Sequence, residues 1–488
     1  MTQFKCNGRT QGTESKVTGV IPKREVSEVA GASTFRYRPV TVVRCQHSYA
    51  KRDRAGRGTM ASLNSRTYHS IASEWSPVRR NYLARGNMRT NRSCSEARDC
   101  SARTVLLLFT TMVIVVSSAV AQSPGVTDNS ILIGSCSALD GPAHVLGRQT
   151  VLGASAYLHM VNDDGGVFGR KIQLQAFDDS YDPDKAPSCF KRMTKEGVFA
   201  LGFFVGTPTA KVYVPMAQEE KIPVVGLFTG AQMLYEPLKH EIINVRASYY
   251  DETREQVDRL WELNIRKIGI IYQDDPFGKA VLEGVKLALQ KHNAAPAALG
   301  TFVRNTVDIE AGMKEVMVAH PQAVIIAGPY APAAAIVKRA HETGWRPQFL
   351  TVSFVGTEEF IKEAGADAEG TIITQVMPPY DRTDYPAVAE YRKCLAKYSP
   401  GEAPTFASLE GFVDAMVVVE GLKRAGKDVT REKFIAAIES IHDMNVGLGP
   451  KLILNYGASG HKGFDSVYPT VVKSGQPVLV TDWSSVGK

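Results

Sequence analysis

Apolar and polar residues alternate along 127–488 in blocks that predict short buried strands, each followed by a helix. The stretch 201–233 shows this pattern most clearly. Apolar runs at 201–205 and 222–225 predict two strands, and 210–220 between them carries apolar residues at helical spacing. A strand, a helix and a second strand in this order form a βαβ unit, whose strands are parallel neighbours in a sheet covered on both faces.

The same alternation covers the rest of this stretch, and it restarts near Ser248. We expect further strands at 131–134, 171–177, 267–272, 297–303, 323–327, 348–352, 371–377, 467–472 and 478–483, and helices at 151–161, 183–195, 252–263, 279–292, 309–319, 332–343, 386–398, 406–424 and 431–441. Strands that alternate with helices in this way predict an α/β fold, here with two doubly wound, Rossmann-like lobes.

The turns that follow the first two strands of the 201–233 unit carry candidate ligand-binding residues. Open α/β sheets bind ligands at the carboxyl ends of their strands. Gly206, Thr207 and Thr209 follow one strand, and Thr229 and Gly230 follow the next. Hydroxyl groups, glycines that allow close approach and unpaired N–H groups at a helix start favour a carboxylate or a similar anion. The alternative is that Thr207 or Thr209 only caps its helix.

Charge is divided unevenly along the chain. The whole sequence has 57 Lys and Arg against 50 Asp and Glu. Residues 1–103 hold about 20 basic and about 7 acidic residues, which leaves a leader of about +13 and a body of about −6. The basic balance of the whole chain is therefore no argument for nucleic-acid binding by the body, and we expect none.

Residues 104–121 have the layout of a secretory signal peptide, with a basic flank at Arg103, an apolar run and small residues at the end. We expect export to the periplasm with cleavage after Ala121, and an uncleaved membrane anchor is the alternative. Residues 1–103 form a basic leader without a sustained apolar period, for which we expect disorder. Because a signal normally lies near the start of a protein, Met88 is the better candidate for the translation start.

The expected mature body holds three cysteines, Cys136, Cys189 and Cys394, so at most one disulfide can form within it. The residue pattern does not favour a bridge, and the pairing stays open. No two of these cysteines have the spacing of metal ligands, and the histidines form no spaced ligand set. We therefore expect neither a metal nor a cofactor.

The sequence lacks the motifs of common enzyme classes. No G-x-G-x-x-G follows a predicted strand, and neither the P-loop pattern G-x-x-x-x-G-K-[ST] nor the pattern G-x-S-x-G occurs. His341 and Glu342 lack the second histidine of a zinc-binding helix. We therefore expect a protein that is not an enzyme.

Several short pieces follow one another along the body, and their ordered set is specific although no single piece is. The pieces are Ile131 to Gly134 with Gly141, Pro142 and Gly147; Val161 and Asn162 with Gly165 to Val167 and Gly169 to Lys171; Asp178 and Asp179 with Asp182 and Pro183; Val205 to Thr209; Tyr272 to Gly278; and Ala340 with Gly344. In this order they resemble the periplasmic binding proteins of ABC transporters, type I fold, in the branched-chain amino-acid (leucine, isoleucine, valine) binding family.

The resemblance implies two lobes joined by a three-segment hinge that closes over a ligand in the cleft. Lobe one is expected at 127–247 plus 378–446, and lobe two at 248–377 plus 447–488. The chain would be the periplasmic solute-binding component of an ABC importer, acting as a monomer with ABC permease subunits of the inner membrane as partners. The alternative is a ligand-sensing receptor or regulator of the same fold, coupled to a signalling partner.

The resemblance also implies roles for the residues around the cleft. The turn with Gly206, Thr207 and Thr209 would bind a ligand carboxylate, and Thr229 with Gly230 would add a second contact. Lobe two would contribute two aromatic residues, Phe277 in place of the tyrosine usual in the family and Tyr330, and the polar residue Ser353. The first crossing would contribute Tyr250, which either orders the ligand or lies at a helix start.

Ser353 stands where the family has the acid that pairs with the ligand ammonium. A buried ammonium without a carboxylate partner is poorly compensated. The cleft therefore lacks the acid for an α-amino acid unless Asp251, Asp274 or Glu410 substitutes. Leu146 also stands where the family has an aromatic residue. We expect a small ligand that is amino-acid-like, a carboxylate or an amide, with an apolar body.

Overall fold

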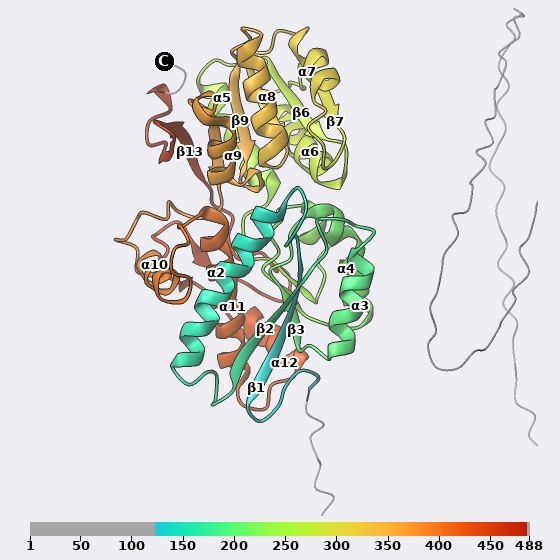
Figure 1. Ribbon diagram of the computed structural model, residues 1–488, viewed down its shortest axis with the longest axis vertical. Helices are drawn as coiled ribbons and strands as arrows, with labels where there is room; N and C mark the ends of the chain where they lie inside the picture. Colours follow the sequence, from blue (N-terminus) through green and yellow to red (C-terminus); the bar gives the residue numbers. More distant parts are fainter. Residues whose placement is uncertain (1–122, 486–488) are drawn as a thin grey trace, which may run out of the picture. The chain divides into compact units, whose positions relative to one another are not determined.

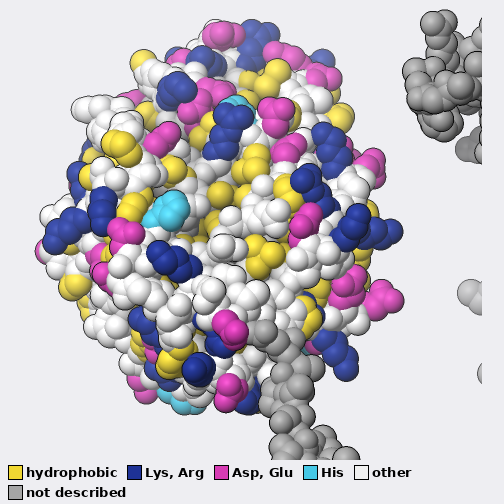
Figure 2. Space-filling view, turned by 60° about the horizontal axis from the view of Figure 1, so that its bottom comes forward, with side chains coloured by type: hydrophobic (Ala, Val, Ile, Leu, Met, Phe, Trp, Pro, Cys, Tyr) yellow, Lys and Arg dark blue, Asp and Glu magenta, His cyan; other side chains and the backbone are white. Residues whose placement is uncertain are grey.

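The computed structural model describes residues 123–485 (Figure 1). The expected leader 1–103, the expected signal 104–121 with its cleavage point, and the start candidate Met88 lie outside the described residues. Among 123–485, no helix combines the length and the hydropathy that crossing a membrane requires. Lys and Arg side chains are interspersed with Asp and Glu on the face that Figure 2 shows, and no extended area there carries a single sign of charge.

The first lobe is built on a sheet with the strand order β2-β1-β3-β4-β5, in which every pairing is parallel. Its strands are β1 Ser130–Ser137, β2 Lys171–Asp178, β3 Ala200–Gly202, β4 Val224–Val225 and β5 Ile242–Ile243. Its helices are α2 His144–Asp163, α3 Ala186–Glu196, α4 Thr207–Glu219, α10 Pro386–Tyr398, α11 Phe406–Ala425 and α12 Arg431–Glu439.

Strand β1 shows why this sheet is buried on both faces. Ile131 and Ile133 pack into a core shared with α2, α10, α11 and α12. Leu132 and Cys136 face the opposite core, which α3 and α4 complete. Successive side chains of a strand point to opposite faces, so one apolar strand serves two layers of helices. Figure 1 shows α3 and α4 on one side of β1 to β3, and α2 and α11 on the other.

The second lobe has the strand order β14-β13-β10-β9-β8-β6-β7, with β13 and β14 added antiparallel to an otherwise parallel sheet. Its strands are β6 Ile268–Gln273, β7 Ala298–Phe302, β8 Ala323–Ala327, β9 Gln348–Val352, β10 Ile372–Gln375, β13 Tyr468–Lys473 and β14 Gln476–Leu479. Its helices are α5 Tyr249–Glu262 and α6 Pro276–Gln290 on one face, and α7 Glu310–Met317, α8 Tyr330–Glu342 and α9 Thr357–Ala364 on the other.

Three segments connect the lobes, and two of them lie side by side. The backbone N–H of Asn244 donates to the oxygen of His461 over 2.9 Å, and the N–H of Phe464 donates to the oxygen of Val245 over 2.9 Å. The remaining segment connects β10 to α10. The chain thus forms two doubly wound α/β lobes joined by a three-segment hinge, as the sequence predicted.

Residues 444–464, beside the expected third crossing at 446/447, contribute to the core of the first lobe. Residues 444–464 include the short strands β11 Met444–Asn445 and β12 Ile453–Leu454. Their apolar side chains pack into the core of the first lobe. We therefore propose that the third crossing begins after Phe464, and we keep the other lobe boundaries as proposed.

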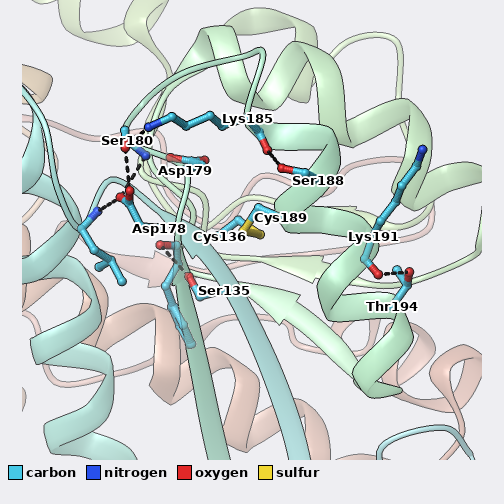
Figure 3. The surroundings of a disulfide bond; sticks show 12 residues. Ser135, Cys136, Asp178, Asp179, Ser180, Lys185, Ser188, Cys189, Lys191 and Thr194 are labelled. Carbon is cyan, nitrogen blue, oxygen red and sulfur yellow. Dashed lines mark hydrogen bonds between the residues drawn. A yellow bond between two sulfur atoms is a disulfide. The ribbon is translucent and has the colours of Figure 1, made fainter. Parts of the chain in front are cut away.

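A disulfide that the residue pattern did not favour joins Cys136, near the end of β1, to Cys189 in α3 (Figure 3). Both residues belong to the core on the α3 and α4 face. Cys394 is free and buried. Because 53 positions separate the two bonded cysteines, only the fold brings them together, and local pattern carries no signal for the pair.

Candidate functional site

The two threonine turns meet at the carboxyl ends of β3 and β4. Thr207 is the first residue of α4, and its Oγ1 lies 2.7 Å from Oγ1 of Thr229. Both side chains are buried. At this distance one hydroxyl donates to the other, so one hydroxyl hydrogen of the pair remains for a ligand. Gly206 is the N-cap of α4 and no side chain caps this helix, so the capping alternative does not apply to Thr207.

Thr209 does not join this pair. Its hydroxyl lies 2.8 Å from the backbone oxygen of Val205 and 3.1 Å from that of Gly206, both at the start of its own helix. A threonine that bonds to the carbonyl oxygens of the preceding turn has no hydroxyl hydrogen left for a ligand. Thr209 therefore does not cap α4 either, and its hydroxyl hydrogen is used by the backbone that precedes the helix.

The two candidate glycines lie against Tyr181 and Tyr249. Gly206 has a φ of +104°, and a Cβ placed there would come within 2.2 Å of the Tyr181 ring. A Cβ at Gly230 would come within 2.7 Å of the backbone nitrogen of Tyr249. Both turns therefore need glycine because tyrosines pack against them.

Aromatic side chains of both lobes fill the space beside the threonine pair. Phe354 lies at the centre, with its ring centroid 4.5 Å from Phe277, 5.7 Å from Phe228 and 5.8 Å from Tyr181. Tyr249 completes the group at 5.4 Å from Phe277. These five residues, which we call the aromatic cluster, are all buried. Phe228 and Tyr181 follow strands of lobe one, whereas Phe277 and Phe354 follow strands of lobe two, so the cluster bridges the cleft.

Two more predicted residues lie in this region. Tyr330 begins α8 and is buried, and burial raises the pKa of its phenol to about 12. A Cβ at Gly356 would come within 3.3 Å of the Tyr330 ring and within 2.6 Å of Leu146. Leu146 of lobe one therefore contacts lobe two where the family has an aromatic residue.

Tyr250 lies apart from the other candidates. It lines a surface groove between α5 and α6 together with Arg254, Gly284 and Lys291. Its neighbour Tyr249 faces the cleft instead, and its phenol lies next to Thr229 without a well-formed hydrogen bond. Adjacent residues of a helix point about 100° apart, so only one of the two tyrosines can face the cleft.

A buried ion cluster lies at the base of the cleft, in the hinge. Arg246 donates from Nη2 to Glu252 over 3.0 Å and from Nη1 to Glu410 over 3.1 Å. Nη2 also contacts the hydroxyl of Ser353, and Thr374 donates to Glu252 over 2.8 Å. We call these five residues the hinge cluster. Because Glu252 belongs to lobe two and Glu410 to lobe one, the guanidinium connects the lobes.

Burial and the neighbouring opposite charges shift the pKa values of this cluster in opposite directions. Burial acts to lower the pKa of Arg246, but the carboxylates of Glu410 and Glu252 outweigh it and raise that pKa. Burial raises the pKa of Glu252 and Glu410, and Arg246 partly offsets both shifts. Asp414, one turn after Glu410, has a pKa far above its usual range because of burial first and the Glu410 charge second.

The cleft is closed in this structure. A void of about 10 Å³ remains, lined by Phe228, Phe406 and Glu410 of lobe one and by Ser353 and Gln375 of lobe two, among others. That volume suits one water. A ligand with an apolar body enters only if the lobes separate about the hinge or the aromatic rings move.

Sequence reasoning missed Tyr181, Phe228 and Phe354 of the aromatic cluster, and it missed Arg246. Phe354 directly follows Ser353 at a strand end, and Phe228 directly precedes Thr229, so their places after buried strands carried a signal. Arg246 carried a weaker one, as a cation within the apolar first crossing. Among 123–485, no group of three or more histidine, cysteine or acidic residues is arranged to hold a metal ion.

Comparison with known proteins agrees with this architecture. The pattern of the periplasmic binding protein family matches residues 130–477. A Leu/Ile/Val-binding protein homolog of Brucella melitensis is 24% identical over 321 residues, which are 64% of this chain and 83% of that protein.

Two solved structures are similar over the whole described body. The crystal structure of a possible leucine/isoleucine/valine-binding protein from Rhodopirellula baltica has 31% identity and a TM-score of 0.71, and covers 74% of this chain and 98% of its own. A substrate-binding periplasmic protein from Ralstonia solanacearum has 27% identity and a TM-score of 0.67, over 72% and 100% of the two chains. These relatives are binding proteins and not enzymes. The chain belongs to the periplasmic binding protein family, in its type I, branched-chain amino-acid branch.

Proposed function

We propose that this chain is the periplasmic solute-binding component of an ABC importer. It would bind a small amino-acid-like, carboxylate or amide ligand with an apolar body in the interlobe cleft. It would then present the closed form to ABC permease subunits of the inner membrane. Cleavage of the exported chain after Ala121 and action as a monomer are parts of the same proposal. Relatives named as Leu/Ile/Val-binding proteins support the amino-acid-like ligand.

One observation carries the proposal. The Thr207–Thr229 hydroxyl pair and the aromatic cluster adjoin at the carboxyl ends of strands, between two lobes joined by a hinge. Hydroxyl groups at the start of α4 suit a carboxylate, since the helix dipole adds positive potential there. The rings suit an apolar body, and hinge closure excludes water from both.

A thermal shift screen of the purified protein tests the proposal. The panel holds branched-chain and aromatic amino acids, their amides, urea, aromatic acids and dicarboxylates. A ligand that binds only the folded state raises the melting temperature by mass action. We expect at least one compound with a carboxylate or amide and an apolar body to do so. If none of them shifts the transition, the proposed ligand class is wrong.

Replacing Thr207 by Val is expected to weaken binding of a carboxylate ligand by about 1.5–3 kcal/mol, since the lost hydroxyl bonds a charged group. Isothermal titration calorimetry measures the change. Thr209→Val is the matched control, because the Thr209 hydroxyl is engaged by its own helix, and its affinity should stay near that of the parent. Equal losses in both variants would remove the threonine pair from the site.

A further inference from the structure

The two carboxylates of the hinge cluster differ in how many donors they receive. Glu252 accepts four hydrogen bonds: from Arg246 over 3.0 Å, from the Ser353 N–H over 2.7 Å, from the Ser353 hydroxyl over 2.9 Å and from Thr374 over 2.8 Å. Glu410 receives one donor within the described residues, Nη1 of Arg246. A carboxylate offers about four lone-pair positions, so Glu252 is saturated whereas Glu410 has acceptor capacity to spare.

A second unused acceptor lines the same void. Gln375 is buried, and its Oε1 has no hydrogen-bond partner within the described residues. Its Nε2 donates to Thr357 Oγ1 over 2.8 Å and to Thr470 Oγ1 over 3.2 Å. A buried acceptor without a donor is costly. Residues with unused acceptors, Glu410 of lobe one and Gln375 of lobe two, therefore both line the void.

The charges in the hinge cluster also favour a hydrogen-bond donor, and specifically a cation. One guanidinium, Arg246, is shared by the carboxylates of Glu252 and Glu410. With both ionised, these three side chains carry one negative charge in excess. Burial raises the pKa of Glu410 to about 7, so an added cation nearby also favours its ionised form. A cation that donates hydrogen bonds would balance the charge and satisfy the acceptors.

The structure also distinguishes the three acids that could substitute for the missing acid at Ser353, because only one of them lines the void. The carboxylate of Asp251 accepts from Ser248, the N-cap of α5, and is paired with Lys462 and Arg254. Asp274 is exposed, and its carboxylate lies 2.9 Å from Lys279. Both are engaged away from the void. Glu410 alone of the three lines it, beside Ser353.

We propose that Glu410, together with Oε1 of Gln375, receives the ammonium group of the cleft ligand in place of the acid that the family has at Ser353. This assignment rests on the proposed function. It orients the ligand, with its ammonium at the hinge cluster, its carboxylate at the Thr207–Thr229 pair and its apolar body among the rings of the aromatic cluster. The void of about 10 Å³ then marks the place of the ammonium head.

A thermodynamic cycle tests the assignment with the full purified protein. Calorimetry compares each amino acid with the acid that lacks only the ammonium, L-leucine with isocaproate and L-phenylalanine with hydrocinnamate, on the parent protein and on Glu410→Gln. We expect the parent to prefer the amino acid of at least one pair. Glu410→Gln should weaken that amino acid by about 10- to 100-fold, as expected for losing a hydrogen bond to a charged group. The matching acid without ammonium should bind both proteins alike.

Asp414→Asn is the matched control, because it replaces a carboxyl one turn from Glu410, on the same helix but outside the lining of the void, by an amide of the same shape. Its affinity for the amino acid should stay at the parent value, and circular dichroism shows that each variant is folded. Equal losses in Glu410→Gln for both members of a pair, or no loss for the amino acid, would overturn the assignment. So would a parent that prefers the acid without ammonium. A parent that binds no member of either pair and no compound of the wider panel overturns the proposed function and this assignment with it.

Discussion

Replacement of Arg246 by Met is expected to lower the free energy of unfolding by about 3–5 kcal/mol, since it removes one partner of a buried ion cluster. The guanidinium and both carboxylates are almost fully buried. Of the donors that the described residues provide, Glu410 would lose its one donor and Glu252 would keep only neutral ones. Urea denaturation followed by circular dichroism measures the change.

An exposed arginine provides the control for this prediction. Arg259 pairs with Glu255 on the surface of α5, and Arg259→Met should cost at most about 1 kcal/mol. A similarly small loss in Arg246→Met would contradict the idea that the cluster depends on its cation.

The pH dependence of the Arg246→Met deficit gives a second readout. Without the guanidinium, the pKa of Glu252 and Glu410 in the folded protein rises further above the unfolded value. A carboxyl whose pKa is higher in the folded state takes up protons on folding, so acid stabilises that state. The deficit should therefore shrink as the pH falls from about 8 to about 5, where both carboxyls approach neutrality. A deficit that is independent of pH would indicate lost packing instead.

The fold was predictable because its signals are local and repeated. Buried runs such as β8 and β9 have the expected bounds, because apolar residues between turns define a strand without reference to the rest of the chain. Elements too short to show a hydrophobic period were not predicted. Strand β5 has two residues, and α9 has eight in a stretch that the pattern left without a helix. The packing of 444–464 against the first lobe has no local signal either, because it depends on tertiary contacts.

The candidate site was predictable where it depends on strand ends and unpredictable where it depends on contacts between lobes. Thr207 and Thr229 follow neighbouring parallel strands, so the topology alone brings them together. Phe354 contacts Tyr181 and Phe228 across the cleft, and no local pattern encodes such contacts. Tyr250 was predicted to contribute to the cleft, whereas Tyr249 faces it in the structure. Which of two adjacent residues faces the cleft depends on the rotation of the helix about its axis, and the sequence pattern does not define that rotation to within one residue.

Removing the Cys136–Cys189 bond, in the variant Cys136→Ala with Cys189→Ala, is expected to lower the free energy of unfolding by about 4 kcal/mol. The figure follows from the entropy that a cross-link across about 53 residues removes from the unfolded chain. Urea denaturation of the oxidised parent and of the variant measures it. The control is Cys394→Ala, which removes a buried free thiol and should cost only about 1 kcal/mol.

Ligand affinity separates the two ways in which this bond can act. The disulfide connects β1 to α3 beside a turn that Asp178 holds (Figure 3). Asp178 accepts the N–H groups of Leu139 over 2.8 Å and of Ser180 over 2.9 Å. That turn leads to Tyr181 of the aromatic cluster. If the bond restrains only the unfolded chain, the folded cleft is unchanged, and the double variant binds its ligand as the parent does at temperatures where both are folded. A variant of unchanged stability and weakened affinity would instead show that the bond holds the Tyr181 turn in place and contributes nothing through the unfolded state.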